Sequence, residues 1–330
     1  MNKIQQVGII GSGKMGSDIF NYLSEFNFQI LWYTRNSEHK EVLHDTFRKK
    51  VNRQLKHGII SKDIFDLRTN YRITDNLNDL SECDLIIETV IEDPLIKIEI
   101  FKKLDQITKP SCILTSNSSS ILPLILGQEL SRKNRLAGMH FFYPVAFKNI
   151  IELIYSDFTD EITRDSIRLF SETIKKFNIE LDEKNAFILN RFLLEIQLKA
   201  LELVKKYNLD YNQIDSIAKQ LIPDFGLFEM MDQVGHNTMY NAIMNYSLMD
   251  SNRKKFNTLL QELTQKKNSE STLFCYDNNS INKIPDSIQT EILNQLKETI
   301  HLTLDQFTKE FQINIFSFKK ALNEFCGINL

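Results

Sequence analysis

The run GSGKMG, residues 11–16, constrains the fold of this chain more than any other stretch of its 330 residues. It fits the pattern G-x-G-x-x-G and follows an apolar run at residues 4–10 that predicts a buried strand. A helical pattern continues at residues 14–26, and a second apolar run at 28–33 predicts another strand. A strand, a glycine-rich turn, a helix and a second strand in this order are typical of a site that holds a dinucleotide.

Each glycine of the turn has a distinct expected role. Gly11 permits the tight turn, Gly13 lets the backbone approach a pyrophosphate, and Gly16 allows the helix to pack closely. The unpaired N–H groups at the start of the helix then face the anion. Lys14 and Met15 complete the turn, and we include them with the glycines among the expected cofactor contacts.

The end of the second strand bears on the choice between NAD and NADP. An NAD site usually carries a carboxylate there, which accepts hydrogen bonds from the ribose hydroxyls. In this chain Thr34 occupies that position and Arg35 follows it. A hydroxyl and a guanidinium suit a 2'-phosphate, so this pair favours NADP. The alternative is a solvated Arg35 and an NAD bound without the carboxylate.

Further apolar runs predict strands at residues 83–90, 111–117 and 135–142, and an amphipathic stretch at 94–107 predicts a helix. This alternation is typical of a parallel sheet with helices on both faces. From about residue 183 apolar residues recur at helical spacing and no clear strand pattern follows. The pattern therefore changes from α/β to all-α within the chain.

We accordingly expect a Rossmann-type dinucleotide-binding domain at residues 1–182 and an all-α C-terminal domain at 183–330. Within the second domain, residues 189–210 and 293–314 share an opening Leu-Asn and a long amphipathic pattern. This similarity indicates either an internal duplication or a chance match between two long helices. The polar stretch 278–287 between them resembles a linker.

Composition excludes several classes of protein. The formal net charge is only -3, which gives no support for a nucleic-acid-binding face. No apolar run approaches the roughly 20 residues needed to cross a bilayer. The 4 cysteines are scattered without the spacing of a metal site, and the N-terminus lacks the pattern of a signal peptide. We expect a cytoplasmic protein with reduced thiols, no metal and no membrane contact.

Two polar motifs carry the candidate chemistry. The run GMHFFYPVAFKNIIEL, residues 138–153, contains His140 and Glu152 in apolar and aromatic surroundings. The run SNSSS, residues 116–120, follows a predicted strand, where open α/β sheets place their ligands. Taken alone, His140 is more often a core histidine, Glu152 an ordinary charge at a strand end, and the serine run a polar turn or helix cap.

Considered in order, these motifs resemble the 3-hydroxyacyl-CoA dehydrogenase family, including the 3-hydroxybutyryl-CoA dehydrogenases. The similarity covers roughly residues 3–245. It rests on IIGSGKMGSDI, CDLIIETVIEDPLIK, TSNSSS, GMHFFYPV with IIEL, AFILNRFL and GLFEMMDQVGHNT. Several motifs in matching order are far more specific than any single one.

The resemblance implies an active site made of Ser119, His140, Glu152 and Asn190. His140 would take the hydroxyl proton of a secondary alcohol while hydride is lost, and Glu152, on an adjacent strand, would orient its ring. Ser119 and Asn190 would hydrogen-bond the substrate oxygens. The resemblance also implies that the helical domain forms a homodimer.

The same resemblance implies further cofactor contacts, namely Glu92 and Lys97 beside the nicotinamide half together with Asn117 of the serine run. The chain also departs from the family pattern. Tyr143 replaces an asparagine expected to touch the cofactor or thioester, and Ala186 replaces a glycine. A bulky phenol at Tyr143, which we include among the substrate contacts, would reshape the pocket.

A basic stretch at residues 47–58 bears on the substrate carrier. A predicted helix there carries Arg48, Lys49, Lys50, Arg53, Lys56 and His57. Such runs are often only solvated faces. The alternative is that side chains such as Lys50 and Lys56 contact the phosphates of coenzyme A or an acidic acyl carrier protein.

The sequence thus predicts an oxidoreductase that interconverts an L-3-hydroxyacyl thioester and the 3-oxoacyl thioester with NAD or NADP. One alternative keeps this scaffold but acts on a free 3-hydroxy acid of the gulonate or carnitine type. A second alternative is a protein that binds NADP without catalysis. The presence of all four expected active-site residue types favours catalysis.

Overall fold

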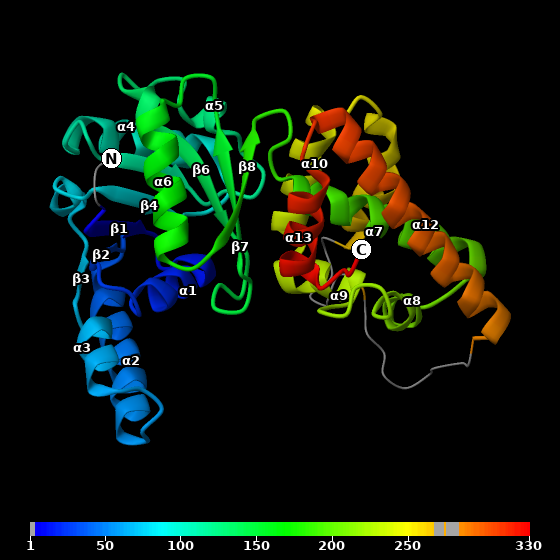
Figure 1. Cartoon of the computed structure of the whole chain (residues 1–330), viewed down its shortest axis with the longest axis horizontal. Helices are drawn as coiled ribbons and strands as arrows, with labels where there is room; N and C mark the ends of the chain where they lie inside the picture. The colour runs from blue at the N-terminus through cyan, green and yellow to red at the C-terminus, as the bar shows by residue number, and fades with distance from the viewer. Residues whose placement is uncertain (1–3, 267–273, 275–283) are drawn as a thin grey trace. The chain divides into compact units, whose positions relative to one another are not determined.

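The computed structural model describes residues 4–266, 274 and 284–330, and the chain divides into two compact units, residues 1–186 and 187–330 (Figure 1). The first unit is built on an eight-stranded sheet. Its strands are β1 (Gln6–Ile10), β2 (Gln29–Tyr33), β3 (Tyr71–Thr74), β4 (Leu85–Glu88), β5 (Ile113–Ser116), β6 (Leu136–Phe141), β7 (Ile150–Tyr155) and β8 (Phe177–Asp182). Their order across the sheet is β3-β2-β1-β4-β5-β6-β7-β8.

Helices connect these strands and cover both faces of the sheet. They are α1 (Lys14–Leu23), α2 (Ser37–Lys56), α3 (Lys62–Arg68), α4 (Pro94–Ile107), α5 (Pro123–Leu126) and α6 (Glu161–Thr173), with short 3₁₀ turns at Leu77–Leu80 and Lys133–Arg135. Successive strand residues point to opposite faces. Ile9 therefore joins the core beneath α1 and α6, whereas Ile10 joins the core beneath α4. The expected strand-turn-helix-strand opening and the two covered faces are confirmed.

The alternation of strands and helices predicted a parallel sheet. The observed sheet is not parallel throughout. Strands β1 to β6 are parallel, but β7 runs antiparallel to β6, and β8 is parallel to β7. The connection at residues 142–149 contains no helix. A crossover between parallel strands needs about a dozen residues or more, so this short connection can only reverse the chain.

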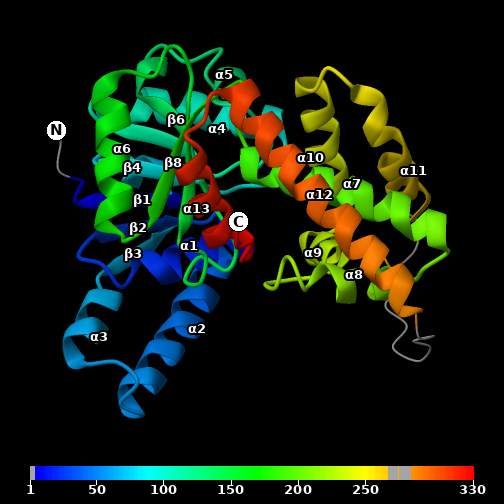
Figure 2. The same cartoon turned by 45° about the vertical axis from the view of Figure 1, so that its right-hand side comes forward.

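The second unit is helical over its described residues. Its α-helices are α7 (Ile188–Tyr207), α8 (Tyr211–Ala218), α9 (Leu227–Val234), α10 (His236–Met249), α11 (Asn257–Lys266), α12 (Asp286–Phe311) and α13 (Ile315–Cys326), with a 3₁₀ turn at Arg253–Phe256. Helix α12 packs along α7 (Figure 2). The edge of Phe192 meets the rings of Phe307 and Phe318 at centroid distances of 6.1 and 5.7 Å.

The two similar segments of the sequence correspond to α7 and α12, and their duplication stays a prediction. Of the expected linker, residues 278–283 lie outside the described part of the chain. Its last two residues belong to α12, which begins at Asp286. In the described residues, the search for helices long and apolar enough to span a bilayer finds none.

Candidate active site

The turn between β1 and α1 is shaped by close backbone contacts. Gly11 has a φ of +109°, and a Cβ there would lie 2.7 Å from Thr89 Oγ1. A Cβ on Gly16 would lie 2.2 Å from the carbonyl oxygen of Gly11. Gly13 is exposed, and a Cβ there would meet nothing within 4 Å among the described atoms. Two glycines are thus required by the protein itself, whereas Gly13 leaves space for a ligand.

Neighbouring side chains fix this turn. Trp32 Nε1 donates a hydrogen bond of 2.8 Å to the Gly11 carbonyl, and Thr89 Oγ1 donates one of 2.8 Å to the Ile10 carbonyl. Helix α1 begins after Gly13, and within the described part of the chain no side chain caps its first N–H groups. Uncapped N–H groups beside open space fit the pyrophosphate of a dinucleotide. Thr89 and Trp32 were not predicted as supports of the turn.

The residues expected to read the adenosine ribose lie at the end of β2. Thr34 is 2% exposed, and its hydroxyl is 3.1 Å from the hydroxyl of Ser12. Arg35 is exposed. Arg35 is therefore the better placed of the two to meet a phosphate in solvent, while Thr34 and Ser12 join the ends of β2 and β1.

His140 and Glu152 lie directly opposite each other on β6 and β7. His140 Nδ1 is 2.7 Å from Glu152 Oε2, and Glu152 is fully buried. Because an ionised carboxylate has no hydrogen to donate, the pairing places the proton of a neutral imidazole on Nδ1 and makes Nε2 the acceptor nitrogen. The antiparallel register thus brings together the two residues that the sequence places 12 positions apart.

The serine run is organised around Glu92. Glu92 Oε1 accepts hydrogen bonds from Ser118 Oγ at 2.5 Å, Ser120 Oγ at 2.9 Å and the Ser119 backbone N–H at 3.2 Å. Ser118 and Ser120 are buried, whereas Ser119 is partly exposed. The carboxylate therefore fixes the backbone from which the Ser119 side chain projects. Glu92 was expected at the cofactor, but its support of the serine run was not predicted.

Glu88, at the end of β4, is a site residue that sequence analysis missed. It is fully buried and accepts hydrogen bonds from Lys97 Nζ at 2.7 Å, Ser116 Oγ at 2.7 Å and the Val90 N–H at 2.6 Å. Lys97 Nζ also lies 3.4 Å from Glu92 Oε2. Lys97 is thus a buried cation between two carboxylates. The available signal was a glutamate ending an apolar strand shortly before a lysine in an amphipathic helix.

Asn117 is buried, and its side-chain oxygen accepts a hydrogen bond of 2.9 Å from the Phe141 N–H. It therefore ties the end of β5 to the end of β6, next to His140.

Met15, expected at the cofactor, is partly buried and packs against the core beneath α1. Asn190 belongs to the second unit, where its Nδ2 donates to Tyr246 Oη at 3.3 Å.

The remaining expected substrate contacts lie on the surface of the first unit. Tyr143 is 46% exposed, and the ammonium of Lys14 lies over its ring at 4.0 Å from the centroid. Lys56 is exposed on α2. Lys50 Nζ donates to Asn21 Oδ1 at 3.0 Å, and its pKa is lowered by burial and then by the nearby Arg68 charge. The Lys50 ammonium is therefore partly occupied by a hydrogen bond within the protein.

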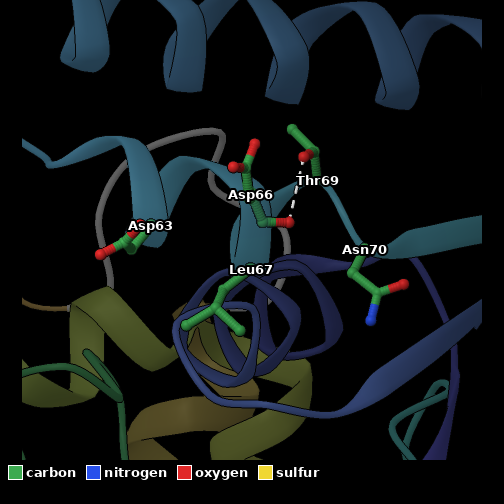
Figure 3. A pocket seen from close by; sticks show the side chains of 5 residues that line it. All are labelled: Asp63, Asp66, Leu67, Thr69 and Asn70. Atoms are coloured by element: carbon green, nitrogen blue, oxygen red, sulfur yellow. Dashed lines mark hydrogen bonds between the residues drawn. The ribbon is translucent and has the colours of Figure 1, made fainter.

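A surface hollow beside α3 is a separate feature. Figure 3 shows its lining residues, Asp63, Asp66, Leu67, Thr69 and Asn70. The Thr69 hydroxyl donates to the Asp66 carbonyl at 3.1 Å, and the Asp66 carboxylate pairs with Lys62. Two carboxylates in such a hollow disfavour a phosphate, and none of the expected site residues lies there.

A Rossmann-type sheet with a dinucleotide turn and a buried imidazole-carboxylate pair defines an NAD-binding oxidoreductase. The model described as 3-hydroxyacyl-CoA dehydrogenase, NAD binding domain, matches residues 6–184, and the corresponding C-terminal domain model matches residues 187–272. The chain therefore belongs to the 3-hydroxyacyl-CoA dehydrogenase family.

Individual relatives agree with this assignment. The mitochondrial hydroxyacyl-coenzyme A dehydrogenase of Sus scrofa is 27% identical over 77% of this chain and 83% of its own length. A 3-hydroxybutyryl-CoA dehydrogenase of Clostridioides difficile is 30% identical over 57% of this chain and 68% of its own. The crystal structure of (S)-3-hydroxybutyryl-CoA dehydrogenase from Ralstonia eutropha matches with a TM-score of 0.74 and 23% identity, over 83% of this chain and 100% of that one.

Proposed function

We propose that this chain interconverts an L-3-hydroxyacyl thioester and the corresponding 3-oxoacyl thioester by hydride transfer with a nicotinamide dinucleotide. The observation that carries the proposal is the 2.7 Å contact between His140 Nδ1 and Glu152 Oε2. This pair lies in the same sheet as a dinucleotide turn, in a chain of the 3-hydroxyacyl-CoA dehydrogenase family. Relatives bearing that name support an acyl-CoA substrate.

The bound dinucleotide would supply the carbon that accepts or returns the hydride. His140 Nε2 takes the proton of the substrate hydroxyl in oxidation and returns it in reduction. Glu152 holds the ring in this tautomer and stabilises the imidazolium that forms. Burial of the pair excludes water and strengthens their interaction.

Ser119 and Asn190 hydrogen-bond the substrate oxygens and so orient the carbinol hydrogen. Glu92 maintains the backbone of Ser119 through its hydrogen bonds to the serine run. Lys97 offsets part of the negative charge of Glu88 and Glu92, which reduces the cost of holding both carboxylates beside the cofactor turn. Glu88 acts through Lys97 and Ser116 as a positioning residue.

The test is a cofactor-oxidation assay with acetoacetyl-CoA, acetoacetyl carrier protein and free 3-oxo acids, each with NADH and NADPH. Turnover of a thioester that is lost in His140→Gln supports the proposal. Turnover of a free acid alone selects the free-acid alternative. Dinucleotide binding without turnover of any substrate selects the non-catalytic alternative.

We further propose that NADP is preferred over NAD. The support is an uncharged Thr34 in place of the usual carboxylate and an exposed Arg35 beside it. Arg35→Gln should weaken NADPH binding about 10-fold, because it removes a charge-assisted hydrogen bond, and leave NADH binding unchanged. Equal or tighter NADH binding by the wild-type protein would contradict this preference.

The basic face of α2 supports a phosphate-bearing carrier, either coenzyme A or an acyl carrier protein. Arg48, Lys49, Arg53 and Lys56 are exposed there, so they can meet an anion.

We infer a homodimer formed through the second unit, supported by the large exposed side chains Leu302 and Phe316, which are 62% and 80% exposed. Sedimentation velocity of the full chain tests the dimer.

A further inference from the structure

The starting observation is the contact between Lys14 of the glycine-rich turn and Tyr143 of the β6–β7 connection. The Lys14 ammonium lies 4.0 Å from the centroid of the Tyr143 ring. Lys14 is exposed and Tyr143 is 46% exposed. A cation over an aromatic face is attracted by the negative charge of the ring face, so the ring holds a side chain that would otherwise sample many rotamers.

The backbone of the connection that carries Tyr143 is held against α1. The Val145 N–H donates to Asp18 Oδ2 at 2.7 Å, and Asp18 lies one turn along α1 from Lys14. Lys176 Nζ donates to the carbonyls of Val145 and Lys148. The connection that carries Tyr143 is thus fastened to the same helix that begins with Lys14, so neither partner of the contact depends on a loose segment.

Lys14 is also the first residue of α1, at the end where the helix N–H groups carry partial positive charge. One residue therefore carries both a backbone N–H and a positively charged side chain at this end of the helix. The neighbouring position is Gly13, where the structure leaves open space. A doubly charged pyrophosphate fits this combination better than a neutral ligand does.

We propose that Lys14 binds the pyrophosphate of the dinucleotide, and that Tyr143 positions the Lys14 ammonium for this contact. The inference rests on the proposed function, because it requires the dinucleotide at this turn. It assigns Tyr143 to the cofactor, one of the two contacts expected at this position, and not to the substrate contacts among which it was included. A pyrophosphate also occurs in coenzyme A, so the two sources must be separated by experiment.

The experiment measures dissociation constants on the full chain by fluorescence titration at two salt concentrations. The ligands are NADH or NADPH, whichever binds the wild type more tightly, reduced nicotinamide mononucleotide, which has no pyrophosphate, and acetoacetyl-CoA. The variants are Lys14→Gln, Tyr143→Leu and Tyr143→Phe, with the double variant of the first two. Lys103→Gln is the matched control, because it removes one exposed lysine charge from α4.

Lys14→Gln should weaken dinucleotide binding about 10-fold and reduce its dependence on salt, because one charge-assisted contact is lost. Tyr143→Leu should weaken it about 3-fold, whereas Tyr143→Phe, which keeps the ring face, should match the wild type. Tyr143→Leu should have no further effect once Lys14 is replaced. Binding of the mononucleotide, which keeps only one of the two phosphates, should weaken less than binding of the dinucleotide, and binding of acetoacetyl-CoA should not change.

Unchanged dinucleotide binding in Lys14→Gln would overturn the proposal, as would equal losses in Tyr143→Phe and Tyr143→Leu. Weaker binding of acetoacetyl-CoA in place of the dinucleotide would assign Lys14 to the other pyrophosphate. These outcomes are independent of turnover. If the wild type binds the dinucleotide but reduces no 3-oxoacyl thioester, the proposed function fails while the assignment of Lys14 is still decided.

Discussion

Glu152 and Glu88 are both fully buried carboxylates, but their partners differ. Glu88 pairs with Lys97 and accepts two further hydrogen bonds. Glu152 faces His140, whose charge can change during a reaction. A buried carboxylate paired with a lysine and two further donors maintains structure, whereas one beside an imidazole can stabilise a cation that forms only transiently. Only the second arrangement is suited to proton transfer.

At the scale of single residues, we predict that Glu152→Gln lowers kcat about 100-fold or more and leaves the dissociation constant of NADH unchanged. The amide removes the negative charge that stabilises the imidazolium and no longer fixes the tautomer of His140. Steady-state kinetics and NADH titration measure the two effects. Because the pair acts as one unit, His140→Gln should add little to the loss in the double variant. Independent, multiplying losses would show that Glu152 does not act through His140.

At the scale of elements, β6 is anchored at its start by a buried ion pair. Arg135, the residue before β6, donates to Asp105 Oδ1 at 2.9 Å and to the carbonyls of Lys109 and Cys112. Burial alone would raise the pKa of Asp105, but hydrogen bonds from Ser131 and Arg135 lower it to about 2. The pair joins the end of α4 to the strand that carries His140.

Asp105→Asn should lower the free energy of unfolding by about 3 kcal/mol at pH 7, because it leaves the buried Arg135 charge uncompensated. A carboxyl whose pKa is lowered on folding stabilises the protein above its unfolded pKa of about 3.8 and loses this effect as the pH falls toward 2. Urea denaturation at several pH values should therefore show a difference that shrinks in acid. Glu99→Gln, at an exposed pair on the same helix, is the control and should change nothing measurable. A difference independent of pH would contradict this account.

The sequence was informative where burial was high and less so at the sheet edges. Strands β3 and β8 lie at the two edges and were not predicted, because YRIT and FNIELD have polar residues where a central strand is apolar. The turn at residues 11–16 was predictable because the glycines that it requires form a local sequence pattern. Glu88 was not predictable as a site residue, because its partner Ser116 comes from another strand and this pairing is set by the tertiary fold.

At the scale of the whole molecule, the residues expected to act on the substrate belong to two different units. The glycine-rich turn, the serine run, His140 and Glu152 belong to residues 1–186, whereas Asn190 belongs to residues 187–330. Asn190 lies on α7 and donates to Tyr246 of α10. If Asn190 acts on the substrate, the second unit contributes to turnover without contributing to cofactor binding.

Asn190→Ala should therefore lower kcat/KM for acetoacetyl-CoA about 100-fold, because the substrate loses one of the groups that orient it, and leave the dissociation constant of NADH unchanged. Tyr246→Phe is the matched control, because it removes the hydrogen bond to Asn190 Nδ2 and retains the amide. It should keep most of the activity, since the amide rather than its support would meet the substrate. Equal losses in the two variants would assign Asn190 to the packing of α7 on α10, and weaker NADH binding in Asn190→Ala would place the cofactor site partly in the second unit.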